Sequence, residues 1–514
     1  MDKKTKKAPV VENEQEKIGK FIADLRERLG LTQEDLAKEL KTSQSAIARM
    51  EAGEQNFSTE MLGKLSHALN RPIIQLASGA VNFKIEGGHK LSGTIVTNTS
   101  KNSAVGLLMA TLINKNKTIL KRMPRIEEVY RLLEVLESLG VSTKWLEGND
   151  LEIVPPAKLN LAGLNTESAT RTRSVLMLLG PLIHLFPEFK LPYPGGCKLG
   201  RRTVRPHLFA LEKLGVKIKA THGYYHVRSS RLRASEVVLY ESGDTVTENV
   251  VMAAARLDGV TTVKFASANY MGQDVCHYLE ALGVQVEGIG TSTLRIYGKS
   301  EIDSPVVFYP GEDPIESMLF LSLAATTNSS ITIERCPIDF LELELLKLEK
   351  MGFKYKILKR YKSYNGYTNL VDIKTLPSKL KALEEKIHAQ PFPGINIDNL
   401  PFFVPVATQA KGTTLIHDWT YENRAIYYME MVKLGADVIL ADPHRVYVNG
   451  PTELRGAEVV CPPALRPAVI ILIGMLAAKG TSVLRNVYSI NRGYEDLCNR
   501  LNKLGARVEI MQGV

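Results

Sequence analysis

The sequence of 514 residues is poor in cysteine and tryptophan and has no long apolar run. Its five cysteines show no C-x-x-C spacing, which excludes a disulfide framework and a cysteine-based zinc site: Cys197, Cys276, Cys336, Cys461 and Cys498. The longest apolar stretch, residues 469–478, is too short to span a bilayer. Residues 1–17 are charged and lack the apolar segment of a signal peptide. We therefore expect free thiols, no membrane span, no cofactor or metal, and a cytoplasmic location.

The composition is that of a folded protein with several domains. Hydrophobic residues make up 44% and charged residues 23%, as in ordinary soluble globular proteins. A chain of this length does not fit around one core, so two to four domains are expected. The formal net charge of +10 predicts acidic partners, either nucleic acid, a phosphorylated substrate, or both.

The N-terminal part has the pattern of a short helical module. Apolar residues recur at helical spacing from Ile18 to Leu29, and Gly30 follows where a C-terminal cap would stand. Thr32 precedes the sequence QED, so its hydroxyl is expected to cap a second helix. Thr42 and Ser43 offer a cap for a third helix over residues 44–51. The order is helix, tight turn, helix.

Residues 16–78 resemble the Cro/C1-type helix-turn-helix family, after a flexible tail over residues 1–15. The resemblance includes a further helix over residues 59–69. It implies that the third helix enters the major groove of duplex DNA, with Gln44, Ser45 and Arg49 toward the bases. One such module reads one half-site, so weak binding as a monomer and a homodimer for useful affinity are expected. The alternative is a four-helix module that contacts proteins.

From residue 82 onward a six-residue phrase recurs six times. The copies are LESLGV (136–141), LEKLGV (211–216), LEALGV (279–284), LEKMGF (348–353), MVKLGA (431–436) and LNKLGA (501–506). Their glycines are 75, 68, 69, 83 and 70 residues apart. Each copy predicts an amphipathic helix that ends at a glycine cap and leads into a strand. The period is too long for common solenoids, so an α/β body of two domains with three units each is predicted.

The stretch PGGCKLGRR, residues 194–202, carries one thiol among three cations. Two adjacent glycines allow a sharp, exposed turn. Lys198, Arg201 and Arg202 favour the thiolate of Cys197 and attract a phosphorylated anion. The alternative is a glycine turn with an incidental cysteine and a solvated basic face.

The six units and this loop resemble the enolpyruvyl transferases, from residue 82 to the end. The resemblance implies an α/β (α+β) fold of two domains, each with three βαβαββ units, and a site in the cleft between them. One domain is expected over residues 101–309, and the other over residues 81–100 together with 310–514. The chain then crosses between the domains twice.

The resemblance also implies the roles of individual residues. Cys197, Lys101 and Asp398 match catalytic positions, and Asn102, Arg173, Arg202, Arg424 and Arg466 match substrate-binding positions. Asp398 lies in the turn PFPGINID (391–398), which has two extra residues, and is preferred as the base over its rival Asp313. The implied reaction joins phosphoenolpyruvate to a hydroxyl of UDP-N-acetylglucosamine through a tetrahedral intermediate, as in peptidoglycan synthesis.

The contacts to the acceptor nucleotide depart from the family pattern. Arg205 stands where the family has an aspartate near uracil, Asp244 starts the segment that contacts the diphosphate, and Asn269 replaces a glutamate. Asp244 near a diphosphate is unfavourable unless a cation such as Arg205 compensates it. These departures favour a second hypothesis, a transcription regulator whose transferase-like body senses a ligand. The branch that acts on shikimate 3-phosphate ranks last, because it lacks the cysteine loop.

Overall fold

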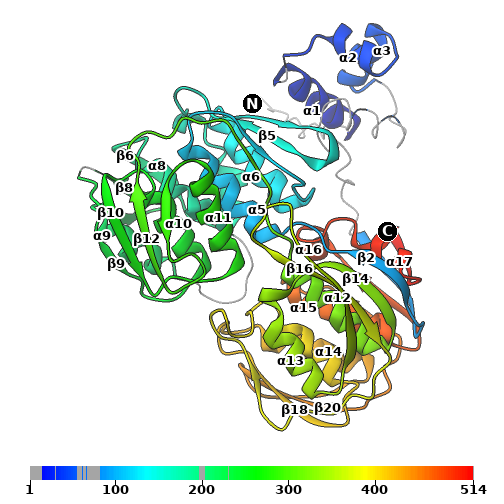
Figure 1. Cartoon of the computed structure of the whole chain (residues 1–514). Coiled ribbons are helices and arrows are strands. Elements are labelled where there is room, and N and C mark those ends of the chain that lie inside the picture. The colour runs from blue at the N-terminus through cyan, green and yellow to red at the C-terminus, as the bar shows by residue number, and fades with distance from the viewer. Residues whose placement is uncertain are drawn as a thin grey trace, which may run out of the picture. The chain divides into compact units, whose positions relative to one another are not determined.

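A computed structural model describes residues 14–28, 30–54, 61, 65, 81–195, 203–229 and 231–512. The chain forms two compact units, residues 1–79 and residues 80–513. None of the helices in the described ranges is long and apolar enough to cross a bilayer. Helices and strands are labelled as in Figure 1.

The N-terminal unit contains the three helices α1 (Glu14–Arg28), α2 (Gln33–Glu39) and α3 (Gln44–Glu51). The predicted cap of the second helix is confirmed: Thr32 Oγ1 accepts from the amide of Asp35, and the Asp35 carboxylate accepts from the amide of Thr32. Ser43 caps α3 by accepting from the Ala46 amide. The predicted fourth helix falls largely outside the described residues, apart from Met61 and Leu65, which are helical.

A small apolar core and one buried ion pair hold these helices together. Ile22, Leu36 and Ile47 are fully buried in it. The guanidinium of Arg26 donates to both carboxylate oxygens of Glu51, at 2.6 and 2.9 Å, and so ties α1 to α3. The packing leaves the opposite face of α3 exposed.

In its described residues the larger unit forms six sheets, one for each copy of the repeated phrase. The repeat helices are α6 (Glu127–Ser138), α9 (Arg205–Lys213), α11 (Tyr270–Ala281), α13 (Glu342–Lys350), the 3₁₀ helix η7 (Ala425–Leu434) and α17 (Leu497–Lys503). All six glycines have φ between +84° and +95°, so the predicted glycine caps are confirmed. A strand begins within two residues of each glycine, as predicted.

One hydrophobic cluster takes its buried residues from Ala104 to Phe308, and we call this part of the unit the first lobe. Its sheets have the orders β13-β3-β5-β4, β6-β8-β7 and β11-β12-β10-β9. Helix α10 packs against β10 and β12 (Figure 1). The strands are β3 (Thr118–Leu120), β4 (Ser142–Trp145), β5 (Leu151–Val154), β6 (Glu188–Pro192), β7 (Lys217–Thr221), β8 (Tyr224–Arg228), β9 (Glu236–Val238), β10 (Gly259–Lys264), β11 (Gln285–Glu287), β12 (Thr293–Gly298) and β13 (Val306–Phe308). The other helices are α5 (Lys101–Ala110), η1 (Thr111–Ile113), η2 (Glu147–Asn149), η3 (Leu161–Gly163), α7 (Thr166–Arg171), η4 (Arg173–Leu178), α8 (Leu179–Leu182) and α10 (Asp244–Ala254).

A second cluster, centred on residues 83–95 and 315–508, defines the second lobe. Its sheets have the orders β15-β16-β14-β2, β17-β18-β20-β19 and β21-β22-β1-β23. The strands are β1 (Val81–Gly87), β2 (Ser92–Val96), β14 (Ser330–Pro337), β15 (Lys354–Lys362), β16 (Asn369–Leu376), β17 (Ile387–His388), β18 (Gly412–His417), β19 (Asp437–Asp442), β20 (Arg445–Gly450), β21 (Glu458–Val460), β22 (Gly480–Arg485) and β23 (Arg507–Gln512). The other helices are α12 (Pro314–Thr327), η5 (Ile338–Phe340), η6 (Leu400–Phe402), α14 (Phe403–Ala407), α15 (Leu465–Ala477) and α16 (Tyr488–Asn491).

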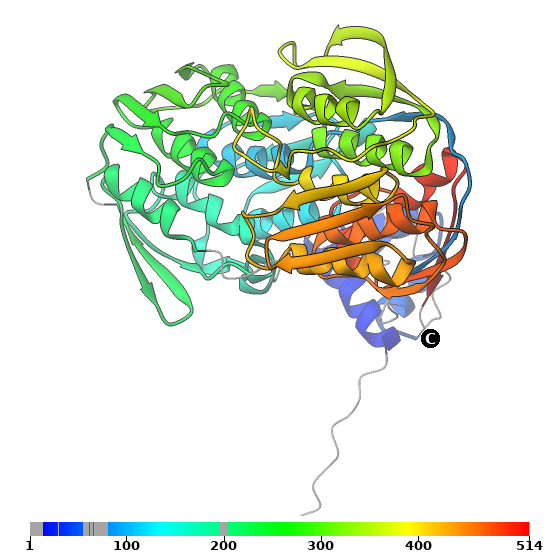
Figure 2. The same cartoon turned by 90° about the horizontal axis from the view of Figure 1, so that it is seen from below.

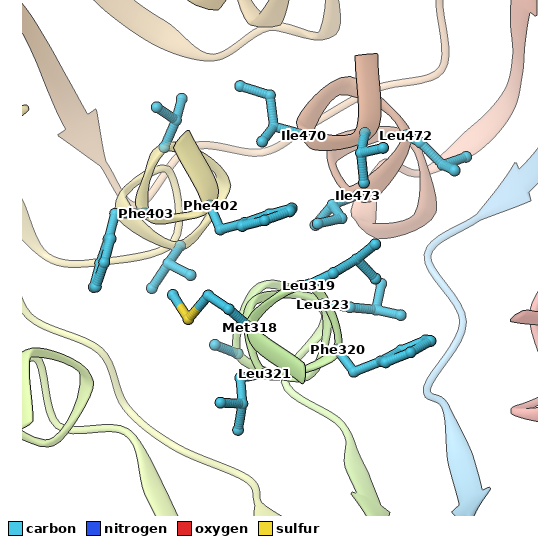
Figure 3. Packing of buried hydrophobic residues seen from close by; sticks show 14 of the residues in the cluster. Met318, Leu319, Phe320, Leu321, Leu323, Phe402, Phe403, Ile470, Leu472 and Ile473 are labelled. Carbon is cyan, nitrogen blue, oxygen red and sulfur yellow. The ribbon is translucent and has the colours of Figure 1, made fainter. Parts of the chain in front are cut away.

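The core of the second lobe lies among helices that its sheets cover. Side chains from α12, from the η6–α14 segment and from α15 point toward one another, among them Met318, Phe402 and Ile473 (Figure 3). Strands β18 and β20 pack on α14, and Figure 2 looks onto the strands of this region, drawn in orange. The apolar run at residues 469–478 is therefore a buried core helix, α15, for most of its length.

Two adjacent chain segments connect the lobes. Thr99 and Glu312 form an antiparallel bridge, and the amide of Ser100 donates to the carbonyl of Gly311 at 2.9 Å. The amide of Asp313 donates to the carbonyl of Asn98 in the same way. This double crossing places the start of α5 beside the start of α12, each helix belonging to a different lobe.

Candidate active site

Three of the predicted site residues meet in the second lobe, where Arg424 and Arg466 both face the carboxylate of Asp398. Asp398 lies just before η6, and its Oδ2 is 3.2 Å from the guanidinium of Arg466. Its Oδ1 is 3.7 Å from the guanidinium of Arg424. Burial acts to raise the pKa of Asp398, but Arg466, Arg424 and Lys101 together hold that pKa below its ordinary value. The carboxylate is therefore ionised at neutral pH and able to accept a proton.

Arg424 is held by a second carboxylate that is completely buried. Asp418, directly after β18, accepts from Arg424 Nε at 2.6 Å and from a second guanidinium nitrogen at 2.8 Å. The hydroxyl of Tyr428 donates to the same carboxylate at 2.5 Å. Arg424 also donates to the carbonyl of Ile397, next to Asp398. These contacts fix the direction from which the cation faces Asp398.

Arg466 opens α15 and is fixed from the C-terminal segment. One guanidinium nitrogen donates to the hydroxyl of Tyr494 at 2.5 Å, while another faces Asp398. Its side chain is only 7% exposed. A buried arginine with one anionic partner keeps donor groups for a further anion.

Lys101 and Asn102 occupy the first turn of α5, at the double crossing between the lobes. Burial lowers the pKa of Lys101, opposed by the carboxylate of Glu128 and, more weakly, by Asp398. Asp398 and Arg466 of the second lobe act electrostatically on Lys101, so the start of α5 lies within the electrostatic reach of the Asp398 cluster. Asn102 Nδ2 donates to the hydroxyl of Tyr270 at 3.1 Å.

The rival carboxylate, Asp313, has a structural task. It caps α12 by accepting from the amides of Ile315 at 2.8 Å and Glu316 at 3.4 Å. The amide of Lys101 lies 3.4 Å from its other oxygen, and burial raises its pKa. The hydrogen bonds of Asp313 thus go to backbone amides, although Arg466 also acts on its charge, whereas Asp398 pairs directly with the guanidinium groups of Arg466 and Arg424.

Arg173 begins η4 in the first lobe and is half-buried. Its guanidinium donates to the carbonyl of Thr203 at 2.9 Å, at the first described residue after the loop. Burial, with a smaller contribution from Arg173, lowers the pKa of His207 to about 4. Cys197 and Arg202, the other predicted residues of this region, lie outside the described residues, as do Lys198 and Arg201.

The altered acceptor segment forms a network of its own. Asp244 accepts from Ser267 Oγ at 2.5 Å and from Asn269 Nδ2 at 3.4 Å. Burial raises the pKa of Asp244 despite these hydrogen bonds. Arg205 is exposed and takes no part in this network. Two neighbouring donors stabilise the carboxylate instead. Compensation of Asp244 by Arg205 beside a bound diphosphate stays a prediction.

The predicted DNA-contacting residues lie on the outer face of α3. Gln44, Ser45 and Arg49 are exposed, whereas Ile47 and Met50 on the opposite face are buried in the core. This is the arrangement that a recognition helix needs. Their contacts with DNA stay a prediction.

Three residues of the candidate site were not predicted from the sequence. Asp418 directly follows β18, whose sequence GTTLIH is too polar to mark the next residue as buried. Tyr494 stands in the C-terminal sequence INRGYE (490–495) and contacts Arg466. Glu128, in the first turn of α6, gives no signal beyond its favourable place at a helix N-terminus.

Comparisons with known proteins agree with this architecture. Residues 85–501 match the family described as EPSP synthase (3-phosphoshikimate 1-carboxyvinyltransferase), and residues 22–76 match the helix-turn-helix family. The UDP-N-acetylglucosamine 1-carboxyvinyltransferase of Bradyrhizobium diazoefficiens is 33% identical over 84% of this chain and 98% of its own length. The enzyme of the same name from Borreliella burgdorferi is 31% identical over 83% of this chain and 98% of its own length.

A solved structure shares the fold at lower identity. The enolpyruvyl transferase NikO from Streptomyces tendae superposes with a TM-score of 0.75 at 23% identity, covering 85% of this chain and all of that one. The family match spans most of the chain, and the curated relatives are covered almost completely. The chain therefore belongs to the enolpyruvyl transferase family of enzymes, with a helix-turn-helix module ahead of the transferase body.

Proposed function

We propose that this protein transfers the enolpyruvyl group of phosphoenolpyruvate to the 3′-hydroxyl of UDP-N-acetylglucosamine and releases phosphate. This reaction is the first committed step of peptidoglycan synthesis. The observation that carries the proposal is the cluster of Arg424, Arg466 and Lys101 around Asp398, at the meeting of two lobes. The names of the curated relatives support the same acceptor.

The cluster suits a substrate that carries both a carboxylate and a phosphate. Arg466 presents planar donors for such an anion. Arg424 gives its donors to Asp418 and to the carbonyl of Ile397, so it is proposed to contribute its positive charge. Arg173 and Arg202 are proposed to add cations from the first lobe. Asn102 is proposed to orient the sugar. No metal or redox cofactor is needed for an addition and an elimination.

Asp398 is proposed to take the proton from the attacking hydroxyl, because the neighbouring cations keep its carboxylate ionised at neutral pH. The acceptor oxygen bonds to C2 of phosphoenolpyruvate, while Cys197 or Lys101 delivers a proton to C3. A lowered pKa suits Lys101 as a proton donor. Loss of phosphate from C2 and of a proton from C3 then gives the enolpyruvyl ether.

Phosphate release from phosphoenolpyruvate with UDP-N-acetylglucosamine is the direct test. We expect turnover that requires both substrates and falls at least 100-fold in Asp398→Asn. The control is Asp339→Asn, an exposed carboxylate of the second lobe that accepts from Asn369 and lies outside the cluster. Release that ignores the sugar nucleotide, or equal effects of the two substitutions, would contradict the proposal.

A specific observation favours a second function for the N-terminal unit. Its exposed recognition face, with Gln44, Ser45 and Arg49, supports binding of duplex DNA. The competing hypothesis for the whole chain is a regulator whose transferase-like body, with its altered acceptor contacts, only senses a ligand. A sensor would bind phosphoenolpyruvate or a sugar nucleotide, change its affinity for DNA and release no phosphate.

A further inference from the structure

Glu128 lies where three parts of the candidate site converge, although no motif marks it. It stands in the first turn of α6 in the first lobe, and its side chain is 13% exposed. Its Oε1 accepts from Thr172 Oγ1 at 2.5 Å and from Ser174 Oγ at 3.3 Å. These two hydroxyls belong to the residues on either side of Arg173.

The other face of Glu128 points to the second lobe. Its Oε2 is 3.8 Å from Nε of Arg492, and its backbone amide lies 3.4 Å from the carbonyl of the same residue. The neighbouring Arg125 amide donates to Glu495 at 3.2 Å, and Asn149 donates to the other oxygen of Glu495. The C-terminal segment therefore rests on the start of α6.

Glu128 is also the strongest anionic neighbour of Lys101. The other charged groups that act on Lys101 are Arg466, Asp398 and Arg492, all from the second lobe. Among the leading influences on Lys101, Glu128 and Asp398 favour the protonated lysine, whereas burial and the two arginines oppose it. One carboxylate thus contacts the Arg173 segment, faces Arg492 and supports the charge of Lys101.

We propose that Glu128 is a positioning residue of the transferase, which orients Arg173 for the anionic substrate and couples its placement to contact with the second lobe through Arg492. The inference rests on the proposed function for its kinetic part. The backbone at Thr172 is extended, and its hydroxyl caps η4 by accepting from the Ser174 amide at 3.1 Å. Both hydroxyls that flank Arg173 donate to Glu128, which therefore adds a second tie to this cap. Glu127, in the same first turn, already gives the N-terminus of α6 a favourable negative charge. The contacts of Glu128 therefore go beyond this helix-terminus effect.

The full-length chain with Glu128→Gln and Glu128→Ala provides the test. Glutamine keeps an oxygen that accepts from the two hydroxyls but removes the charge; alanine removes both. We expect Glu128→Ala to raise the KM for phosphoenolpyruvate roughly tenfold to a hundredfold. Glu128→Gln should change that KM less, and should shift the basic limb of the kcat/KM profile to lower pH because Lys101 loses an anionic neighbour.

Glu127→Gln is the matched control. Glu127 lies in the same first turn and pairs with Arg131 at 2.7 Å, so it shares the helix-terminus effect. We expect it to leave both the KM and the pH profile unchanged. A purely structural Glu128 would lower the melting temperature in both variants without moving either kinetic quantity, and that result would overturn the proposal.

A readout that needs no turnover separates this inference from the proposed function. The pH dependence of Lys101 acetylation by acetic anhydride, followed by peptide mass spectrometry, reports the lysine pKa directly. We expect a lower apparent pKa in Glu128→Gln and an unchanged one in Glu127→Gln. Inactive wild type with this shift present would refute the transferase reaction alone. An unshifted lysine together with an unchanged KM in Glu128→Ala would refute the role of Glu128.

Discussion

The buried ion pair between Asp418 and Arg424 allows stability and activity to be perturbed separately. Asp418 has no exposed surface and gives Arg424 its two shortest ionic contacts, at 2.6 and 2.8 Å. Asp418→Asn keeps the size of the side chain and an oxygen for the Tyr428 hydroxyl, but it leaves the guanidinium buried without its main counter-charge. Removing one partner of such a pair costs about 3–5 kcal/mol of unfolding free energy.

The corresponding fall in melting temperature is roughly 6–20 °C if the second lobe unfolds as a unit of about 200 residues. Arg424 also loses the contacts that aim it at Asp398, so phosphate release should fall at least 100-fold. The control is Asp442→Asn, which breaks the exposed contact of Asp442 with Arg445 at 2.6 Å. Loss of that pair should cost less than about 1 kcal/mol.

The double variant Asp418→Asn with Arg424→Met completes the design. Removing both charges eliminates the unpaired buried cation, so the melting temperature should return toward that of the wild type. Activity should stay low, because a cation of the proposed anion site is gone. If Asp418→Asn melts within about 2 °C of the wild type, the assigned role of the pair is refuted. A double variant less stable than the single one would refute it as well.

Three further predictions concern other parts of the chain. His207 is buried with a pKa of about 4 and accepts from Asn249 Nδ2 at Nδ1, so the unfolded chain binds more protons than the fold between pH 4 and about 6.5. The free energy of unfolding should therefore fall as the pH drops through that window, by at most about 3 kcal/mol for this site. In urea unfolding, His207→Gln should make this fall with pH less steep, and an equally steep fall in the variant would contradict the prediction. Arg49→Ala should weaken binding to a preferred duplex by about 1–3 kcal/mol and relax the sequence preference, as measured by fluorescence anisotropy; an equal loss for every duplex would contradict a base contact. Fosfomycin, an epoxide that mimics phosphoenolpyruvate, should alkylate Cys197, with protection by phosphoenolpyruvate; mass spectrometry that finds the label on Cys276, Cys336, Cys461 or Cys498 instead would count against a catalytic loop.

Local signals in the sequence were sufficient for much of the fold. The six glycine caps were predicted because a positive φ after an amphipathic helix leaves few residue types to choose from. The caps at Thr32 and Ser43 depend on residues only three positions away. Such features are fixed within one turn of the chain, and no tertiary contact is needed to read them.

Pairings across long stretches of sequence could not be predicted in this way. Glu128 and Arg492 belong to different lobes, and no sequence pattern near either residue predicts their contact. Asp418 lies only six residues from Arg424, yet burial rather than spacing gives the pair its importance. The amino-acid types predicted an anion site, whereas the groups that aim each cation became visible only in three dimensions.

The acceptor segment shows why departures from a family pattern should be judged together. Taken one at a time, Asp244 and Asn269 each remove a contact expected for the acceptor. In the structure Asn269 and Ser267 both donate to Asp244, so the two departures belong to one hydrogen-bonded network. Ser267 and Asn269 lower the pKa of Asp244, whereas burial raises it and outweighs them. Asp244 and Asn269 therefore count as one coupled departure, because replacing either alone would leave the other short of a hydrogen-bond partner.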